Sequence, residues 1–112
     1  MSPITTHVLD TSAGRPAADV PVTLDVRRDG AWQMAGRGMT DADGRLRTLL
    51  DDPSPGAGVY RLTFDTAAYY ERAGIDAFYP RIVVEFTVPE GAAHYHVPLL
   101  LSPFGYTTYR GT

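Results

Sequence analysis

The chain has 112 residues, a formal net charge of −3, 44% hydrophobic and 21% charged residues, and we interpret residues 1–112 as one globular domain. The negative charge argues against a nucleic acid or an anionic membrane surface as partner, because both attract clustered positive charge. No apolar run approaches the ~18 residues of a membrane span and no secretory signal is recognised, so we expect a cytoplasmic protein.

Eight short β-strands are predicted from apolar and β-branched runs that are bounded by turn sequences. In chain order they cover residues 4–9, 20–26, 31–39, 46–50, 59–64, 82–88, 94–101 and 104–109. Asp29-Gly30 is typical of a two-residue hairpin turn. Gly36 and Gly38 would allow a bulge in the strand that returns from that turn. Loops or turns are expected at 10–14, 40–45, 51–58 and 89–92.

One short helix is predicted between the strands at 59–64 and 82–88. Asp65-Thr66 offers an N-cap, residues 67–73 have helical character, and Gly74 would end the helix. Short strands at this spacing, with loops of hairpin length, predict an all-β antiparallel sandwich or barrel.

The composition limits the chemistry that an enzyme of this sequence can use. The chain has no cysteine, and all ten basic residues are arginine. Thiolate and lysine nucleophiles are therefore excluded. The Gly-x-Ser-x-Gly and Walker-type motifs are also absent. Histidine, arginine, carboxylates, hydroxyls and the backbone remain.

The three histidines and one arginine are the candidate functional residues. His94 and His96 are two positions apart in a predicted strand, so they share a face, with Tyr95 on the other face toward the core. His7 lies in the first strand, and Arg45 follows a turn. Imidazole moves protons near neutral pH because its pKa is about 6.5, and arginine holds anions or a developing oxyanion. This combination would suit hydrolysis of a small anionic or carbonyl-rich substrate.

Other interpretations of these residues stay open from the sequence. A strand histidine on a mixed face is often only a hydrogen-bonded structural residue, and an arginine after a turn is often only solvated. The His94-x-His96 pair with His7 as a third ligand also fits a zinc site, although no acidic or cysteine ligand accompanies it.

Several segments in a fixed order resemble the transthyretin-like family, in its 5-hydroxyisourate hydrolase branch. They are residues 7–10 (HVLD), 14–17 (GRPA), 40–45 (TDADGR), 78–80 (FYP), 94–103 (HYHVPLLLSP) and 109–112 (YRGT). The resemblance covers essentially the whole chain. It implies an eight-stranded antiparallel β-sandwich with one short helix. It also implies a homotetramer, a dimer of dimers with active sites in channels at the dimer–dimer interface, and hydrolysis of 5-hydroxyisourate in urate degradation with no metal or organic cofactor.

The resemblance also implies which residues act. His7, Arg45 and His96 match the catalytic positions, and either histidine could be the general base. The substrate-binding positions are His7, Arg45, Tyr109, Arg110 and Thr112, of which the last three belong to the closing segment. Thr112 stands where the family usually has serine, so it keeps the hydroxyl and adds a methyl group. His94 does not match a catalytic position and is expected to be structural.

Two alternatives come from other functional classes. Transthyretin itself carries thyroid hormone in its channel without catalysis, but the family's carriers lack the histidines and the Tyr-Arg-Gly ending that this chain has. An interaction module would leave the histidines and Arg45 without a purpose. The hydrolase is therefore the favoured prediction.

Overall fold

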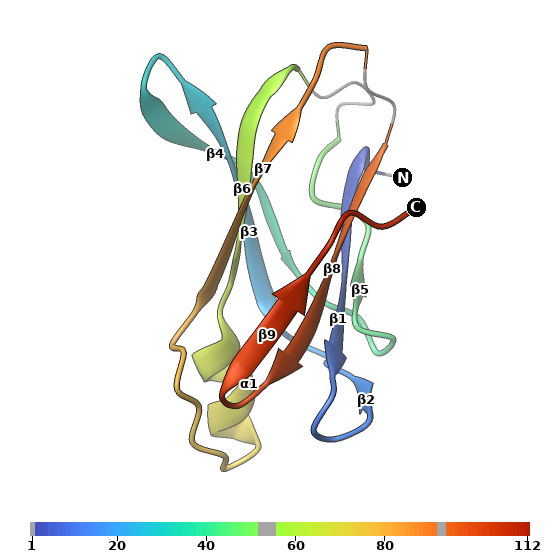
Figure 1. Ribbon diagram of the computed structural model, residues 1–112, viewed down its shortest axis with the longest axis vertical. Helices are drawn as coiled ribbons and strands as arrows, with labels where there is room; N and C mark the ends of the chain where they lie inside the picture. The colour runs from blue at the N-terminus through green and yellow to red at the C-terminus, as the bar shows by residue number, and fades with distance from the viewer. Residues whose placement is uncertain (1, 52–55, 92–93) are drawn as a thin grey trace.

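Two β-sheets pack face to face in the computed structural model, which describes residues 2–51, 56–91 and 94–112 (Figure 1). The β1 sheet has the order β2-β1-β8-β9, with β5 also paired to β1, and the β3 sheet has the order β4-β3-β6-β7. The strands of the β1 sheet are β1 (Ile4–Asp10), β2 (Arg15–Pro16), β5 (Arg45–Leu46), β8 (Tyr95–Ser102) and β9 (Gly105–Thr108). Those of the β3 sheet are β3 (Pro21–Arg28), β4 (Ala31–Met39), β6 (Gly58–Phe64) and β7 (Ile82–Val88), and helix α1 (Thr66–Arg72) connects β6 to β7.

The predicted sandwich with one short helix is confirmed, with two differences in its strands. The strand expected at 46–50 is only the two-residue β5, although Leu49 is buried. The two-residue β2 lies where no strand was predicted. The predicted loop at 51–58 and turn at 89–92 lie partly outside the described residues.

The predicted hairpin and bulge in the β3 sheet are confirmed. Asp29 and Gly30 both have positive φ, 51° and 76°, as the favoured two-residue hairpin turn requires. The pairing of β3 with β4 shifts register between Leu24 and Asp25. The extra residue on β4 lies next to Gly36, where an added Cβ would come within 1.7 Å of the Leu49 carbonyl oxygen. A glycine is therefore required at the bulge.

One strand pair departs from the expected antiparallel arrangement. β1 and β8 run parallel, with Thr5 opposite His96 and His7 opposite Pro98. Hairpin turns impose antiparallel pairing on neighbouring strands, but β1 and β8 are far apart in the sequence and no turn sets their direction. This parallel pair brings the first and last histidine-bearing segments side by side.

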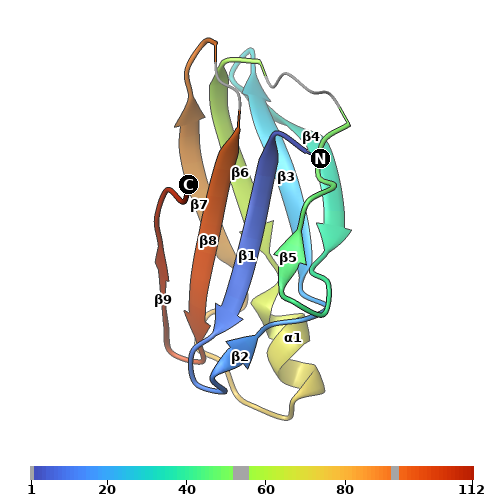
Figure 2. The same ribbon diagram turned by 90° about the vertical axis from the view of Figure 1, so that its right-hand side faces the viewer.

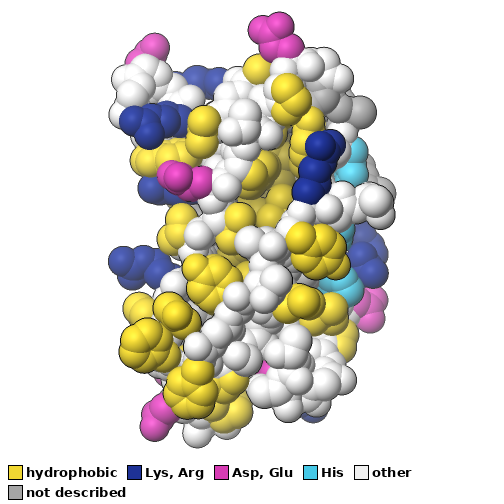
Figure 3. All heavy atoms as spheres, viewed as in Figure 1, with side chains coloured by type: hydrophobic (Ala, Val, Ile, Leu, Met, Phe, Trp, Pro, Cys, Tyr) yellow, Lys and Arg dark blue, Asp and Glu magenta, His cyan; other side chains and the backbone are white. Residues whose placement is uncertain are grey.

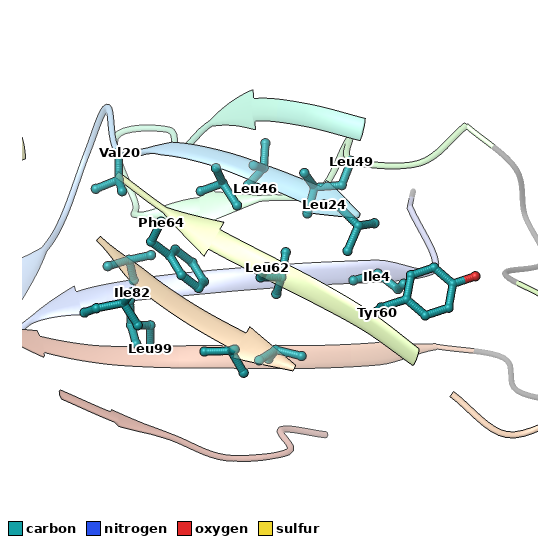
Figure 4. Close-up of a cluster of buried hydrophobic side chains, with 14 of the residues drawn as sticks. Ile4, Val20, Leu24, Leu46, Leu49, Tyr60, Leu62, Phe64, Ile82 and Leu99 are labelled. Atoms are coloured by element: carbon teal, nitrogen blue, oxygen red, sulfur yellow. The ribbon is translucent and has the colours of Figure 1, made fainter. Parts of the chain in front are cut away.

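The core lies between the two sheets (Figure 4). Tyr60, Leu62 and Phe64 of β6 point from the β3 sheet toward Ile4 and Leu99 of the β1 sheet, and each of the five is at most 2% exposed. Tyr95, Val97, Leu99 and Leu101 of β8 are also buried, as the alternation in this strand predicts. The inner face of the β1 sheet is packed in the core, so its outer face is the one available for a functional site.

Helix α1 is capped as predicted and is tied to the β1 sheet. The Asp65 side chain accepts a hydrogen bond from the Ala68 N–H, and Gly74 follows the helix at a φ of +69°. The Tyr69 hydroxyl donates to Asp10 Oδ2 at 2.7 Å, at the end of β1. Within the part of the chain that is described, no helix is long and apolar enough to cross a bilayer.

Candidate active site

The three histidines and Arg45 belong to β1, β5, β8 and the residue just before β8, and these three strands lie side by side in the β1 sheet (Figure 2). His7 of β1 is the register partner of Arg45 of β5, and Thr5 of β1 is the register partner of His96 of β8. Paired residues and residues two apart share a face of a sheet, so these four side chains project from the same side. Histidine and arginine side chains lie together along the right-hand edge of Figure 3.

A cavity of about 170 Å³ is hollowed in this face. It is lined by Thr5, Thr6, Arg45, Arg47, His94, His96 and Thr112. Three predicted site residues, Arg45, His96 and Thr112, therefore meet although they come from three separate parts of the chain. Among its described lining residues, the cavity combines two histidines with two arginines and has no Asp or Glu side chain, which suits a substrate that is anionic or develops negative charge.

His7 lies beside this cavity, and its ring is held by one hydrogen bond. Its Nε2 is 2.8 Å from the Asp43 carbonyl oxygen. A carbonyl only accepts hydrogen bonds, so Nε2 carries the proton and Nδ1 of the neutral ring keeps its lone pair. Asp43 precedes Gly44, whose φ of +76° makes the turn that leads into Arg45. The same turn therefore positions both His7 and Arg45.

His96 is half-buried, and its ring is hydrogen-bonded to a threonine hydroxyl. Its Nδ1 is 2.8 Å from Thr5 Oγ1, which is also 3.2 Å from His94 Nε2. Burial lowers the pKa of His96 below its ordinary value of 6.5, and nearby cationic groups lower it further. These groups are Arg45, His7, His94 and Arg47. The His96 ring is therefore mostly neutral at neutral pH, as a general base must be.

The closing segment docks on β8 beside His96. The Gly111 N–H donates to the His96 carbonyl oxygen at 2.8 Å, and the two residues form an antiparallel bridge. A Cβ at position 111 would lie 2.7 Å from Cδ2 of the His96 ring. Only glycine lets the backbone approach this closely, and this approach brings Thr112 to the cavity.

Tyr109 and Arg110 are not brought to the same cavity. They line a separate groove of about 260 Å³, whose other lining residues are Val84, Glu85, Phe86, Thr87, Pro89, Tyr95, Val97 and Thr108. The Arg110 guanidinium lies over the Tyr95 ring, 4.7 Å from its centroid. In Figure 3 the molecule is hollowed here between β7 and β8, with hydrophobic side chains on the floor. A substrate-binding role for these two residues stays a prediction.

Three cavity residues, Thr5, Thr6 and Arg47, were missed by the sequence analysis. Thr5 and Arg47 each lie two positions from a predicted site residue, Thr5 from His7 and Arg47 from Arg45. Residues two apart in a strand share a face, so the positions of His7 and Arg45 could have indicated Thr5 and Arg47 as well. His94 was expected to be structural, yet it lines the cavity. Among the described residues, no group of three or more histidines, cysteines or acidic residues could hold a metal ion.

Comparisons with known proteins agree with this fold. The family model described as "HIUase/Transthyretin family" matches residues 4–111. A relative named "5-hydroxyisourate hydrolase" in Salmonella typhi is 43% identical over 97% of this chain and 80% of its own length. The Mus musculus protein of the same name is 42% identical over 99% of this chain and 96% of its own length.

Solved structures include both branches of the family. The structure of Klebsiella pneumoniae 5-hydroxyisourate hydrolase aligns with a TM-score of 0.85 and 40% identity over 100% of both chains. Transthyretin from Sparus aurata aligns with a TM-score of 0.91 and 38% identity over 99% of this chain and 97% of that chain. With the family model matching nearly its full length, the chain belongs to the HIUase/transthyretin family.

Proposed function

We propose that this chain, as one domain, hydrolyses 5-hydroxyisourate to 2-oxo-4-hydroxy-4-carboxy-5-ureidoimidazoline in urate degradation, without a metal or organic cofactor. The observation that carries the proposal is the meeting of Arg45, His96 and Thr112 in one cavity, with His7 paired to Arg45. The relatives named "5-hydroxyisourate hydrolase" in Salmonella typhi and Mus musculus support the same substrate.

His96 is the proposed general base. It lines the cavity, and its lowered pKa keeps the ring neutral at neutral pH. Its Nε2 takes a proton from water while the water oxygen bonds to the carbonyl carbon of the ring amide. The C–N bond then breaks, and the ring nitrogen receives a proton. Proton transfer of this kind contributes roughly 10²–10⁴-fold to rate.

Arg45 and His7 are proposed to bind the substrate and the developing charge. The Arg45 guanidinium would hold the oxyanion that forms when water adds to the carbonyl. His7 is oriented by the Asp43 carbonyl, which leaves Nδ1 free to bind a substrate N–H or to serve as a second base. Thr112, which lines the cavity, would bind substrate from the docked segment. Tyr109 and Arg110 are also proposed to bind substrate, from the separate groove that they line.

A hormone carrier of the transthyretin type is the alternative, and the fold does not decide between the two. Sparus aurata transthyretin aligns with a higher TM-score than the Klebsiella hydrolase, 0.91 against 0.85. The decision rests on the side chains, because a carrier has no use for Arg45 and a neutral His96 in one polar cavity. The site therefore favours the hydrolase.

A homotetramer is proposed as the active assembly, and the cytoplasm as its compartment. A cavity of about 170 Å³ is smaller than the ~300–1,000 Å³ of typical ligand sites, which supports completion of the site by a second subunit. Aromatic side chains near β9 are also left exposed: Phe104 is 74%, Phe78 70% and Tyr106 43% exposed. Patches of this kind mark interaction surfaces. Light scattering after size-exclusion chromatography measures the assembly.

The activity is tested by forming 5-hydroxyisourate in place from urate and urate oxidase and following its ultraviolet absorbance. The compound decays unaided, so a control without the chain sets the baseline. We expect faster decay with the chain, and loss of the acceleration in His96→Ala. Decay at the baseline rate with a folded tetramer would contradict the proposal. Binding of thyroid hormone by the same sample would then support the carrier.

A further inference from the structure

A single hydroxyl lies between two imidazole rings at the floor of the cavity. Thr5 Oγ1 is 2.8 Å from His96 Nδ1 and 3.2 Å from His94 Nε2. Thr5 is 3% exposed, whereas the His94 ring is open to solvent. The hydroxyl thus connects the proposed base to a second ring that can exchange protons with water.

The proton count of this hydroxyl allows only two arrangements. A threonine hydroxyl has one proton, so it donates to one ring nitrogen and accepts from the other. In the outward arrangement, His96 Nδ1–H donates to Thr5, Thr5 donates to His94 Nε2, and His96 Nε2 has a free lone pair. In the inward arrangement, His94 Nε2–H donates to Thr5, Thr5 donates to His96 Nδ1, and His96 Nε2 carries the proton. Only the outward arrangement leaves His96 able to act as a base.

The same count disfavours charging both rings together. An imidazolium has N–H groups at both nitrogens, so two imidazolium rings would present two donors to Thr5 and break one hydrogen bond. Other positive groups around His96 disfavour a second charge further. These groups are His7 on β1, Arg45 on β5 and Arg47 directly after β5. Burial makes the largest contribution to the lowered pKa of His96, and these positive groups lower it further.

We propose that Thr5 and His94 are positioning residues that connect His96 to solvent as a proton relay. The inference rests on the proposed function, in which His96 Nε2 takes a proton from the attacking water. The Nδ1 proton of His96 then moves to Thr5 Oγ1, the original Thr5 proton moves to His94 Nε2, and the His94 Nδ1 proton passes to solvent. The pair ends in the inward arrangement with both rings neutral.

The relay runs backward when the substrate C–N bond breaks. His96 Nε2–H gives its proton to the leaving ring nitrogen, while solvent returns a proton to His94 Nδ1. His94 Nε2–H gives its proton to Thr5, and the Thr5 proton moves to His96 Nδ1. The outward arrangement is restored, and one water has been consumed with no net charge left on the protein.

The test compares Thr5→Val, Thr5→Ser and Thr11→Val in the full chain. Thr5→Val replaces the hydroxyl by a methyl group of similar size, and Thr5→Ser keeps the hydroxyl. Thr11→Val is the control, because the Thr11 hydroxyl donates to the Leu101 carbonyl oxygen, at 3.1 Å, and Thr11 does not belong to the described lining of the cavity. Imidazole ¹⁵N–¹H correlation spectra show which ring nitrogen carries the proton at each pH, without substrate.

We expect the His96 nitrogen signals to move when His94 titrates in the wild type, in Thr5→Ser and in Thr11→Val, and to lose this dependence in Thr5→Val. We expect kcat to fall about tenfold or more in Thr5→Val with KM little changed, which is part of the ~10²–10⁴-fold that positioned proton transfer supplies. Thr5→Ser should regain most of the loss. His94→Leu, at an exposed position, breaks the relay at its outer end and should give the same loss of kcat even if Thr5→Val does not fold.

Three outcomes in the variants would overturn the relay. They are an unchanged coupling of the two rings in Thr5→Val, an equal loss of kcat in Thr5→Val and Thr5→Ser, and full activity in His94→Leu. The spectra report the protonation of the two imidazole rings in the absence of substrate. A wild-type chain with coupled rings but no hydrolysis would therefore refute the proposed function, and uncoupled rings in an active chain would refute the relay.

Discussion

Gly111 lies against the ring of His96, with its N–H on the His96 carbonyl oxygen at 2.8 Å and no room for a side chain. An added Cβ would be 2.7 Å from the ring, so either the closing segment or the imidazole must move. The closing segment therefore acts on the proposed base through a backbone contact as well as through its side chains.

Gly111→Ala should lower kcat/KM markedly while the chain stays folded. Displacement of a catalytic group by about 1 Å can cost roughly 10²-fold. Gly105→Ala is the matched control, because a Cβ there meets only Ser102 Oγ, at 3.7 Å. The coupled ultraviolet assay measures both variants, and equal activity in the two would contradict a steric role for Gly111.

Removal of residues 109–112 should leave a folded chain with a defective site. β9 ends at Thr108, so the truncation spares every described strand. It removes the Gly111 bridge to His96 and the Thr112 wall of the cavity. Circular dichroism checks the fold and the assay checks turnover. Unaltered turnover would rule out a docked segment that completes the site.

His7→Ala, Arg45→Ala and His96→Ala should each fold and each lose most activity. All three side chains are on the outer face of the β1 sheet, so none removes core volume. Loss of a general base or an oxyanion partner costs roughly 10²–10⁴-fold in rate. Steady-state kinetics on each variant measure the loss, and a variant that keeps the wild-type rate would take its residue out of the mechanism.

The pH dependence of kcat/KM should reflect the neutral state of His96. Burial and the neighbouring positive charges place the pKa of His96 below 6.5, so the base is neutral above that pKa and activity falls as the pH drops through it. More than half of the maximal kcat/KM should therefore remain at pH 6.5. Arg47→Gln removes one neighbouring charge and should move the acidic limb to higher pH. A limb above pH 6.5 in the wild type would contradict His96 as the base.

Tyr69→Phe should destabilise the fold without touching the site. Burial alone would raise the pKa of the Asp10 carboxyl, but hydrogen bonds from Tyr69, Ala13 and Ser12 outweigh burial and lower it below 3.8. Burial, helped by the bond to Asp10, raises the pKa of Tyr69 to about 12, so this hydroxyl keeps its proton. Loss of a hydrogen bond to a buried charge costs about 1–3 kcal/mol of unfolding free energy.

The sign of the pH effect at Asp10 follows from its lowered pKa. Its contribution to stability is present above the ordinary carboxyl pKa and is lost as the pH falls through the lower folded value. Urea unfolding of wild type and Tyr69→Phe between pH 3 and 7 measures this. The variant should be less stable at pH 7, and the gap between the two should narrow toward acid. Equal stability at pH 7 would contradict the role of this bond.

The sequence predicted the longer strands, but it missed the two-residue β2 and the parallel direction of the pairing between β1 and β8. Alternation identified the buried face of β8, and the Asp29-Gly30 turn predicted the β3–β4 hairpin. The direction of β8 along β1 depends on contacts between the two ends of the chain, which no turn sequence encodes. Without that pairing, the contact of Thr5 with both histidines was not visible.

The site was predicted by residue type, and the structure adds which residues share a cavity. His96 stands on the strand face that alternation assigns to it. The side chains of the closing segment depend instead on how its backbone meets β8. The bridge at Gly111 places Thr112 at the cavity, while Arg110 turns to the Tyr95 ring in the other groove. The linear motif of residues 109–112 does not show which of its side chains reach the cavity and which reach the other groove.

The parallel pairing of β1 with β8 also bears on how the chain folds. Thr5 and His96 are 91 positions apart, so their contact closes a loop that spans most of the chain. Closing long loops is entropically costly, and such contacts slow folding. The face that carries the candidate site is therefore expected to form late, after the local hairpins of the β3 sheet. A folding intermediate would have a protected β3 sheet and no activity, which makes activity a reporter of the final step of folding.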